Sequence, residues 1–270
     1  MSKNFLYNTI PGRLILKPLT HPAVSRLAGA FLDTKLSKPV IPFFVNKCNI
    51  DVSEYNVEGI KTFNEFFRRP LKCGMREFDT DDRVFCAPCD GLLTAYRIED
   101  GLVLPVKQSS YTISSLLKSR MIADAYNGGW CMVFRLCVNH YHRYAYAVSG
   151  NKTCNRHIEG ILHTVRPVAL EVTPVFSQNT REYTVIKNRE FGRVLQMEVG
   201  AMLVGRIKNH ASEGCKVVRG TEKGFFEYGG STIIVLVEPC KLELDNKITE
   251  ASIQGMETPV IMGQPVGRAL

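Results

Sequence analysis

The chain has 270 residues, of which 45% are apolar and 22% are charged. This composition is typical of a globular protein of one large or two small domains. It excludes global disorder, a fibrous repeat and a coiled coil. No stretch approaches the roughly 20 consecutive apolar residues that a membrane-spanning helix requires.

The net charge of +8 is concentrated near the start of the chain. Residues 1–50 contain seven basic side chains and a single acidic one, Asp33, which gives +6 of the total. Such a segment suggests an anionic partner, either a lipid surface or a nucleic acid. The alternative is a solvated face that binds nothing.

The nine cysteines are odd in number and irregularly spaced, which argues against a disulfide framework. Residues 1–16 lack the compact apolar core of a signal peptide, and we therefore expect a reducing, cytosolic setting. Cys86-Ala-Pro-Cys89 has the spacing of zinc and redox sites but no second ligand pair, so we expect two buried thiols and no metal.

The first 70 residues are expected to be helical. Apolar residues recur at helical spacing over 21–33, and a second apolar segment covers 40–45. Thr62-Phe-Asn-Glu65 resembles a capping box, and Pro70 bounds the short helix that would follow it. Residues 70–83 are expected to form a charged linker.

Beyond residue 83 the pattern becomes β-rich, with one helix expected over 111–122. Short apolar runs alternate with Gly, Pro and Asn turns; they cover 102–106, 130–138, 170–176, 183–186, 194–199, 202–207, 216–219 and 232–237. This spacing predicts an α+β protein with a barrel or sandwich-like β body (71–270) and a small helical N-terminal region (1–70).

Three short motifs have chemical potential. Gly229-Gly-Ser231-Thr232 reads most simply as a glycine turn entering a strand. A Gly-Ser pair also suits backbone self-cleavage, because the unhindered Gly230 carbonyl can be attacked by the Ser231 hydroxyl once a base takes its proton. Asp90 precedes a glycine in a turn, and it could alternatively orient a histidine.

His140 and His142 are two residues apart, after the apolar run 130–138. On a continuous strand their side chains would point to the same side. A metal pair is conceivable, but no third ligand is evident. Either histidine is suitable as a general base.

The order of these motifs and their flanks resembles the phosphatidylserine decarboxylase family over about residues 20–240. Six blocks carry the resemblance: Thr62-Phe-Asn-Glu-Phe-Phe-Arg-Arg-Pro-Leu-Lys72, Ala87-Pro-Cys-Asp-Gly91, Tyr141-His-Arg143, Gln178-Asn-Thr-Arg-Glu182, Gly200-Ala-Met-Leu-Val-Gly-Arg-Ile207 and Lys223-Gly-Phe-Phe-Glu-Tyr-Gly-Gly-Ser-Thr-Ile233.

The resemblance implies a self-processing enzyme with a pyruvoyl cofactor. Ser231 would attack the Gly230 carbonyl, and the chain would divide into 1–230 and 231–270, which stay tightly bound. The pyruvoyl ketone left at position 231 would form a Schiff base with phosphatidylserine and take up the electrons released as CO2 leaves, giving phosphatidylethanolamine. Asp90 matches the acidic member of the family's self-cleavage Asp-His-Ser set, and His142 matches a histidine assigned to decarboxylation.

One position departs from the family pattern. The second histidine of the motif, the usual base for the serine, is Ala145 here, and the motif's leading Asp is His140. His163 or His140 could substitute, and we favour His163 because its block runs beside the processing site in the family. An uncleaved, inactive lipid-binding relative and an enzyme acting on another serine-headed lipid remain the alternatives.

A lipid substrate also accounts for the basic N-terminal region. Val24, Leu27 and Phe31 are expected to enter or face the surface of an anionic membrane, with the protein peripheral on its cytoplasmic side. Packing of these residues on the body is an equally good expectation. Substrate or membrane contacts are also expected at His140, Tyr141 and Arg143. A homodimer is implied by the resemblance alone, and nucleic acid is not expected because no binding motif accompanies the charge.

Overall fold

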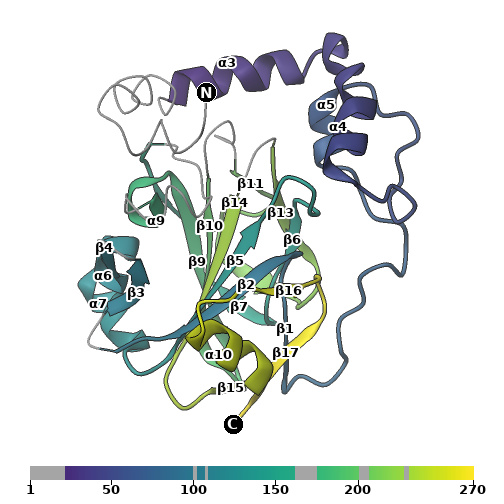
Figure 1. The fold of residues 1–270 in the computed structure, drawn as a ribbon. Coiled ribbons are helices and arrows are strands. Elements are labelled where there is room, and N and C mark those ends of the chain that lie inside the picture. Colours follow the sequence, from purple (N-terminus) through teal and green to yellow (C-terminus); the bar gives the residue numbers. More distant parts are fainter. Residues whose placement is uncertain (1–21, 100–101, 107–108, 162–174, 201–206, 228–230) are drawn as a thin grey trace.

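The computed structural model describes residues 22–99, 102–106, 109–161, 175–200, 207–227 and 231–270. Its N-terminal part is helical, as expected: α3 (Pro22–Leu32), η1 (Lys35–Ser37), α4 (Val40–Cys48) and the short α5 (Phe63–Phe67). These elements cover one end of the β-rich body (Figure 1).

The expected cap at the start of α5 is present. The Thr62 hydroxyl accepts a hydrogen bond from the Glu65 backbone N–H at 3.1 Å, and the Glu65 carboxylate accepts one from the Lys61 N–H at 2.6 Å. Helix α5 buries Phe63, Phe66 and Phe67 against Phe44 of α4. Tyr141 of the body belongs to the same buried cluster, which therefore joins the N-terminal helices to the body.

The body is built on a large antiparallel sheet. Its path runs β12 (Cys215–Val217), β7 (Gly150–Lys152), β9 (Arg181–Asn188), β10 (Gly192–Val199), β14 (Ser231–Val237), β5 (Trp130–Leu136), β2 (Gly91–Arg97) and β16 (Thr258–Val260), and β8 (Arg156–Ile158) pairs with β9. The path is open at β12 and β16, so the fold is sandwich-like rather than a closed barrel. The expected α+β class is confirmed.

Smaller elements cover the two faces of this sheet. The remaining strands are β1 (Val84–Cys86), β17 (Pro265–Ala269) and β15 (Leu242–Leu244) in one sheet, β11 (Ile207–Asn209), β13 (Glu222–Phe226) and β6 (Arg143–Ala145) in another, and the hairpin β3 (Leu102–Val106) and β4 (Ser109–Thr112). The other helices are α6 (Ile113–Leu117), α7 (Arg120–Ala123), η2 (Asp124–Tyr126), α9 (Val175–Gln178) and α10 (Asn246–Ile253).

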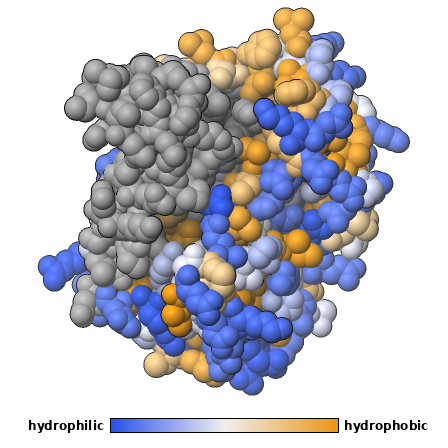
Figure 2. Space-filling model, in the orientation of Figure 1, coloured by the Kyte–Doolittle hydropathy of each residue, from blue (hydrophilic) through white to orange (hydrophobic). Residues whose placement is uncertain are grey.

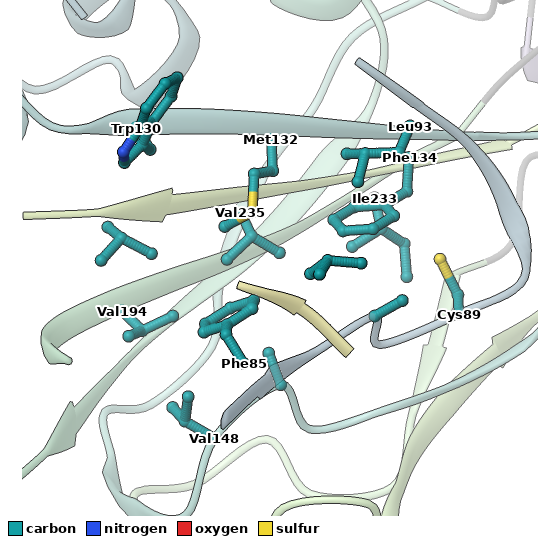
Figure 3. Close-up of a cluster of buried hydrophobic side chains, with 14 of the residues drawn as sticks. Phe85, Cys89, Leu93, Trp130, Met132, Phe134, Val148, Val194, Ile233 and Val235 are labelled. Atoms are coloured by element: carbon teal, nitrogen blue, oxygen red, sulfur yellow. The ribbon is translucent and has the colours of Figure 1, made fainter. Parts of the chain in front are cut away.

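Strand β14 lies at the centre of the large sheet, and all seven of its residues are buried. Ile233, Val235 and Val237 face one core with Phe134 and Met132 of β5, as Figure 3 shows for the labelled side chains, whereas Ile234 and Leu236 face a second core beneath α6 and α9. Each such buried side chain contributes roughly 1.5–3 kcal/mol. A strand buried on both faces fixes the register of its first residue, Ser231, opposite Leu136.

The structure corrects two sequence-based expectations and leaves most of a third outside the described residues. Residues 111–122 do not form one helix, because Lys118 adopts a left-handed conformation (φ 48°) between α6 and α7. Of the strand expected over 170–176, residues 170–174 lie outside the described residues, and Val175 begins helix α9. Of the strand expected over 202–207, only Ile207 is described, where β11 begins.

Candidate active site

Ser231 is the first residue of β14, and its side chain is completely buried. It lies on the same sheet face as Ile233, because side chains alternate along a strand. The neighbouring Gly230, the other half of the expected cleavage site, lies outside the described residues. The central strand therefore holds the serine hydroxyl in a fixed, buried position.

His142 contacts this serine. Its Nδ1 atom lies 3.3 Å from the Ser231 Oγ atom, and its Nε2 atom lies 3.0 Å from the carbonyl oxygen of Cys137. A carbonyl can only accept a hydrogen bond, so Nε2 carries the proton and Nδ1 presents its lone pair to the hydroxyl. This tautomer is the one that a general base requires.

The ring of His142 is held in place from its other side by Phe67 of α5. The two rings stack with centroids 4.0 Å apart. The backbone of His142 is also fixed, because its carbonyl accepts a hydrogen bond from the Phe226 N–H at 2.9 Å. The N-terminal helical region thus contributes directly to the site.

The environment of His142 keeps it neutral. Complete burial lowers its pKa well below the ordinary value, and the positive charge of Arg69 and the proximity of His140 lower the pKa further. The hydrogen bond to Cys137 opposes this effect but is the smallest contribution. At neutral pH the ring is therefore neutral, and its Nδ1 atom can accept the proton of Ser231.

Asp90, expected to orient a histidine, is instead bound to an arginine. Its two carboxylate oxygens accept hydrogen bonds from Nε and Nη2 of Arg76 at 3.1 and 3.0 Å, and Oδ1 also accepts one from the Met262 N–H at 2.8 Å. Among the described residues no histidine is hydrogen-bonded to it. The hydrogen-bonded unit at the serine is thus His142–Ser231, without the carboxylate.

Ala145, at the position of the second motif histidine, lies beside the turn that carries Asp90. Its N–H donates to the carbonyl of Pro88 at 2.9 Å. A methyl group at this position offers no proton acceptor. Residue 145 therefore does not link the carboxylate of Asp90 to the hydroxyl of Ser231.

Of the two histidines considered as substitutes for the missing motif histidine, the structure describes only one. His163 lies outside the described residues. His140 belongs to the turn after β5, where its Nδ1 accepts a hydrogen bond from the Cys137 N–H at 3.1 Å. The expectation that His140 and His142 share a strand face is wrong, because β5 ends at Leu136 and the chain turns between the two residues.

Tyr141 and Arg143 have local structural contacts. Tyr141 is buried with its ring 5.8 Å from that of Tyr55. Arg143 donates to the Arg68 carbonyl at 2.7 Å and to the Glu222 carboxylate at 2.8 Å. Their expected contact with a substrate or a membrane stays a prediction.

Four groups at the site were not anticipated: the ring of Phe67, the carbonyl of Cys137, and the guanidinium groups of Arg69 and Arg76. Three of the four lie in or just after the block 62–72 that carries part of the family resemblance. That block was a usable signal, but only the fold shows that it packs against residues 140–143.

Comparison with known proteins identifies the family of the chain. The family model described as phosphatidylserine decarboxylase matches residues 63–268. A phosphatidylserine decarboxylase proenzyme 2 of Clostridium acetobutylicum is 40% identical over 264 residues, which cover 97% of this chain and 90% of the relative. A phosphatidylserine decarboxylase proenzyme of Ruminiclostridium cellulolyticum is 40% identical over 272 residues, covering 99% and 91%. One of Clostridium botulinum (strain Alaska E43) is 36% identical over 266 residues, covering 97% and 90%. The chain belongs to the phosphatidylserine decarboxylase family.

Proposed function

We propose that this protein cleaves itself between Gly230 and Ser231 and then decarboxylates phosphatidylserine to phosphatidylethanolamine, using a pyruvoyl group made from Ser231. The observation that carries the proposal is the contact between the unprotonated Nδ1 of His142 and the Ser231 hydroxyl. Family membership supports the substrate, since the relatives are named phosphatidylserine decarboxylase proenzymes.

The cleavage begins with His142 taking the proton of Ser231. Oγ then bonds to the carbonyl carbon of Gly230, and the bond between that carbon and the Ser231 nitrogen breaks, with the nitrogen leaving as an amine. Loss of the Ser231 α-proton breaks the Cβ–Oγ bond and frees the Gly230 carboxylate. Water then replaces the nitrogen, which departs as ammonia, and the ketone of a pyruvoyl group is left.

This assignment gives His142 the role expected of His163 or His140. Our reason is geometric: His142 is the histidine whose ring nitrogen is within hydrogen-bond reach of Ser231 among the described residues. The same histidine is adjacent to the pyruvoyl position after cleavage. It is therefore also placed to handle a proton during decarboxylation, as the resemblance implies.

When formed, the pyruvoyl group supplies an electrophilic ketone that binds the substrate amine and accepts electrons as CO2 leaves. The chain fits such a group, because Ser231 begins a strand that is held on both sides. Strand β14 pairs with β10 and β5, and β17 pairs with β1, so the fragment 231–270 contributes strands to sheets of the fragment 1–230. The two fragments should remain together after the cut.

The N-terminal helices are proposed to dock on an anionic membrane. Leu27, Phe31, Leu36 and Phe43 expose 73%, 51%, 77% and 65% of their surface on α3, η1 and α4. Figure 2 shows hydrophobic residues gathered over this end of the molecule. In the part of the chain that the structure describes, no helix combines the length and apolar character needed to cross a bilayer.

A hollow of about 1000 Å³ is lined in part by residues of η1 and α4, the elements that carry Leu36 and Phe43, and its walls suit a lipid. Ile41, Val45 and Phe66 contribute apolar surface, while Lys35 and Lys38 line it as well and carry positive charge. An acyl chain matches the apolar wall, and an anionic headgroup matches the lysines. The side chain of Val24 lies outside the described part, so its expected membrane contact stays a prediction.

The proposal is tested by incubating the purified protein with phosphatidylserine vesicles and measuring CO2 and phosphatidylethanolamine. We expect turnover by the unaltered protein, none by Ser231→Ala, and normal turnover by Ser119→Ala, whose hydroxyl makes no cap hydrogen bond. An uncut protein that binds the vesicles but releases no CO2 would instead support the lipid-binding alternative. A panel of other serine-headed lipids would identify a different substrate.

A further inference from the structure

Arg69 is a buried arginine without a matching anion. It lies two residues after the end of α5, and its side chain is completely inaccessible to solvent. Its Nη1 atom makes one long hydrogen bond, 3.4 Å, to the carbonyl of Phe66. Neither Nε nor Nη2 meets an acceptor among the residues that the structure describes.

Arg181 is the other fully buried arginine among the described residues, and its guanidinium nitrogens all have acceptors. It donates from Nε, Nη1 and Nη2 to the carbonyls of Leu116, Asn179 and Ser115. Burying a charged group is unfavourable where its hydrogen-bonding groups lack partners. Nε and Nη2 of Arg69 therefore have hydrogen-bonding capacity that an anionic group can fill.

The free edge of Arg69 is the one by which two other arginines of this protein bind a carboxylate at two points. Arg76 binds the two oxygens of Asp90 through Nε and Nη2, and Arg135 binds the two oxygens of Glu257 through the same pair of atoms. This fork matches a carboxylate or a phosphate with two parallel hydrogen bonds. Asp90 is close enough to influence the charge of Arg69, but both of its oxygens are already bound to Arg76.

The position of Arg69 connects it to the reacting serine. Phe67, two residues earlier, stacks on His142, which contacts Ser231, and the charge of Arg69 itself acts on His142. The guanidinium is fixed between rings, with its Cζ atom 4.1 Å from the centroid of Tyr55 and 5.0 Å from that of Phe66. A planar cation held in this way is oriented before any ligand arrives.

We propose that Arg69 binds an anionic group of the substrate, through a two-point contact from Nε and Nη2, in the processed enzyme. This inference rests on the proposed function, which supplies a headgroup with two anions, a carboxylate and a phosphodiester. Ser231 is as deeply buried as Arg69 in the uncut chain and must still meet the substrate. Any path that brings the headgroup to residue 231 therefore also brings it close to Arg69.

The test compares processed Arg69→Gln and Arg69→Lys enzymes with the unaltered protein, and uses Arg181→Lys as the matched buried control. The substrate is short-chain phosphatidylserine below its micelle concentration. We expect kcat/KM to fall roughly 10- to 100-fold in Arg69→Gln, chiefly through KM, because a charge-assisted pair is lost. Arg69→Lys keeps the charge without the fork and should fall less, and Arg181→Lys should stay within about twofold.

Inhibition by short-chain phosphatidylethanolamine distinguishes the two anions, since it has the phosphodiester but no carboxylate. An inhibition constant unchanged by Arg69→Gln assigns the contact to the carboxylate. An inhibition constant that rises by the same factor as KM assigns it to the phosphodiester.

The proposal is overturned if both Arg69 variants mature and keep kcat/KM within about threefold. It is also overturned if both stay uncut while Arg181→Lys matures, because Arg69 would then serve cleavage rather than substrate binding. If the unaltered protein neither cuts itself nor releases CO2, the proposed function is at fault instead.

Discussion

Replacing His142 by alanine should block self-cleavage. The substitution removes the only ring nitrogen that faces the Ser231 hydroxyl among the described residues, at 3.3 Å. Ser231 has no exposed surface, so bulk water has no ready access to act as the base in its place. A positioned general base contributes about 10²- to 10⁴-fold to a rate, and we expect a loss of that size.

The assay follows conversion of the 30.3 kDa chain into fragments 1–230 and 231–270 over time after synthesis. His140→Ala is the matched control, because it removes a neighbouring histidine whose ring bonds the Cys137 N–H rather than the serine. His140→Ala should cut within a few-fold of the normal rate.

A control must show that slow cleavage in His142→Ala comes from the missing base and not from unfolding of the variant. His142→Ala also removes the hydrogen bond to Cys137 and the stacking on Phe67, which together contribute about 2 kcal/mol. Circular dichroism should still show a folded chain. Cleavage by His142→Ala within about threefold of the normal rate would refute the reasoning, and His163→Ala would become the variant to examine.

The other predictions concern pH, a buried ion pair and the membrane. Because burial lowers the pKa of His142, its neutral form persists below pH 6.5. The rate of cleavage should therefore stay constant between pH 8 and pH 6. A decline of this rate centred near pH 6.5 would contradict a neutral buried ring. Below pH 6.5 the unfolded chain protonates His142 and the folded chain does not, so protonation favours the unfolded state. The contribution of His142 to stability is therefore complete above about pH 6.5 and declines as the pH falls toward its lowered pKa. A lower melting temperature at pH 5.5 than at pH 7.5 is the expected result. Lys223→Met leaves the Glu198 carboxylate buried without its cation and should lower the free energy of unfolding by about 3–5 kcal/mol in urea titrations. The double variant that also carries Glu198→Gln should recover much of this lost stability. A loss under 1 kcal/mol in Lys223→Met would refute the importance of the pair. Phe31→Ser should weaken binding to phosphatidylserine vesicles in sedimentation assays, whereas Met121→Ser, at an even more exposed apolar residue on α7, should not; equal effects would argue against a docking surface at α3.

Much of the fold was predictable from local pattern. The strands over 102–106, 194–199 and 232–237 were expected from apolar runs between turn residues, and they occur with bounds shifted by at most two residues. The helix expected over 111–122 was wrong because a run of mixed apolar residues does not reveal a left-handed residue in its middle. Lys118 is of a type that favours helix, and tertiary packing overrides that preference.

The site was predictable in its members but not in its contacts. Ser231, His142 and Asp90 were identified from motif order and flanks, and two of them meet as a hydrogen-bonded pair. The partner of Asp90 was not predictable, because Arg76 is one of many charged residues in a segment that resembled a linker. The strand alternation assumed for His140 and His142 also failed, because β5 ends at Leu136 and both histidines lie in the segment that follows.

The most direct test of the central claim is the intact mass of the purified protein under denaturing conditions. We predict two polypeptides, residues 1–230 and residues 231–270, the second beginning with a pyruvoyl group in place of serine and therefore lacking a free amine. A single chain of 30.3 kDa with Ser231 intact would contradict self-processing and with it the assignment of His142 as the base.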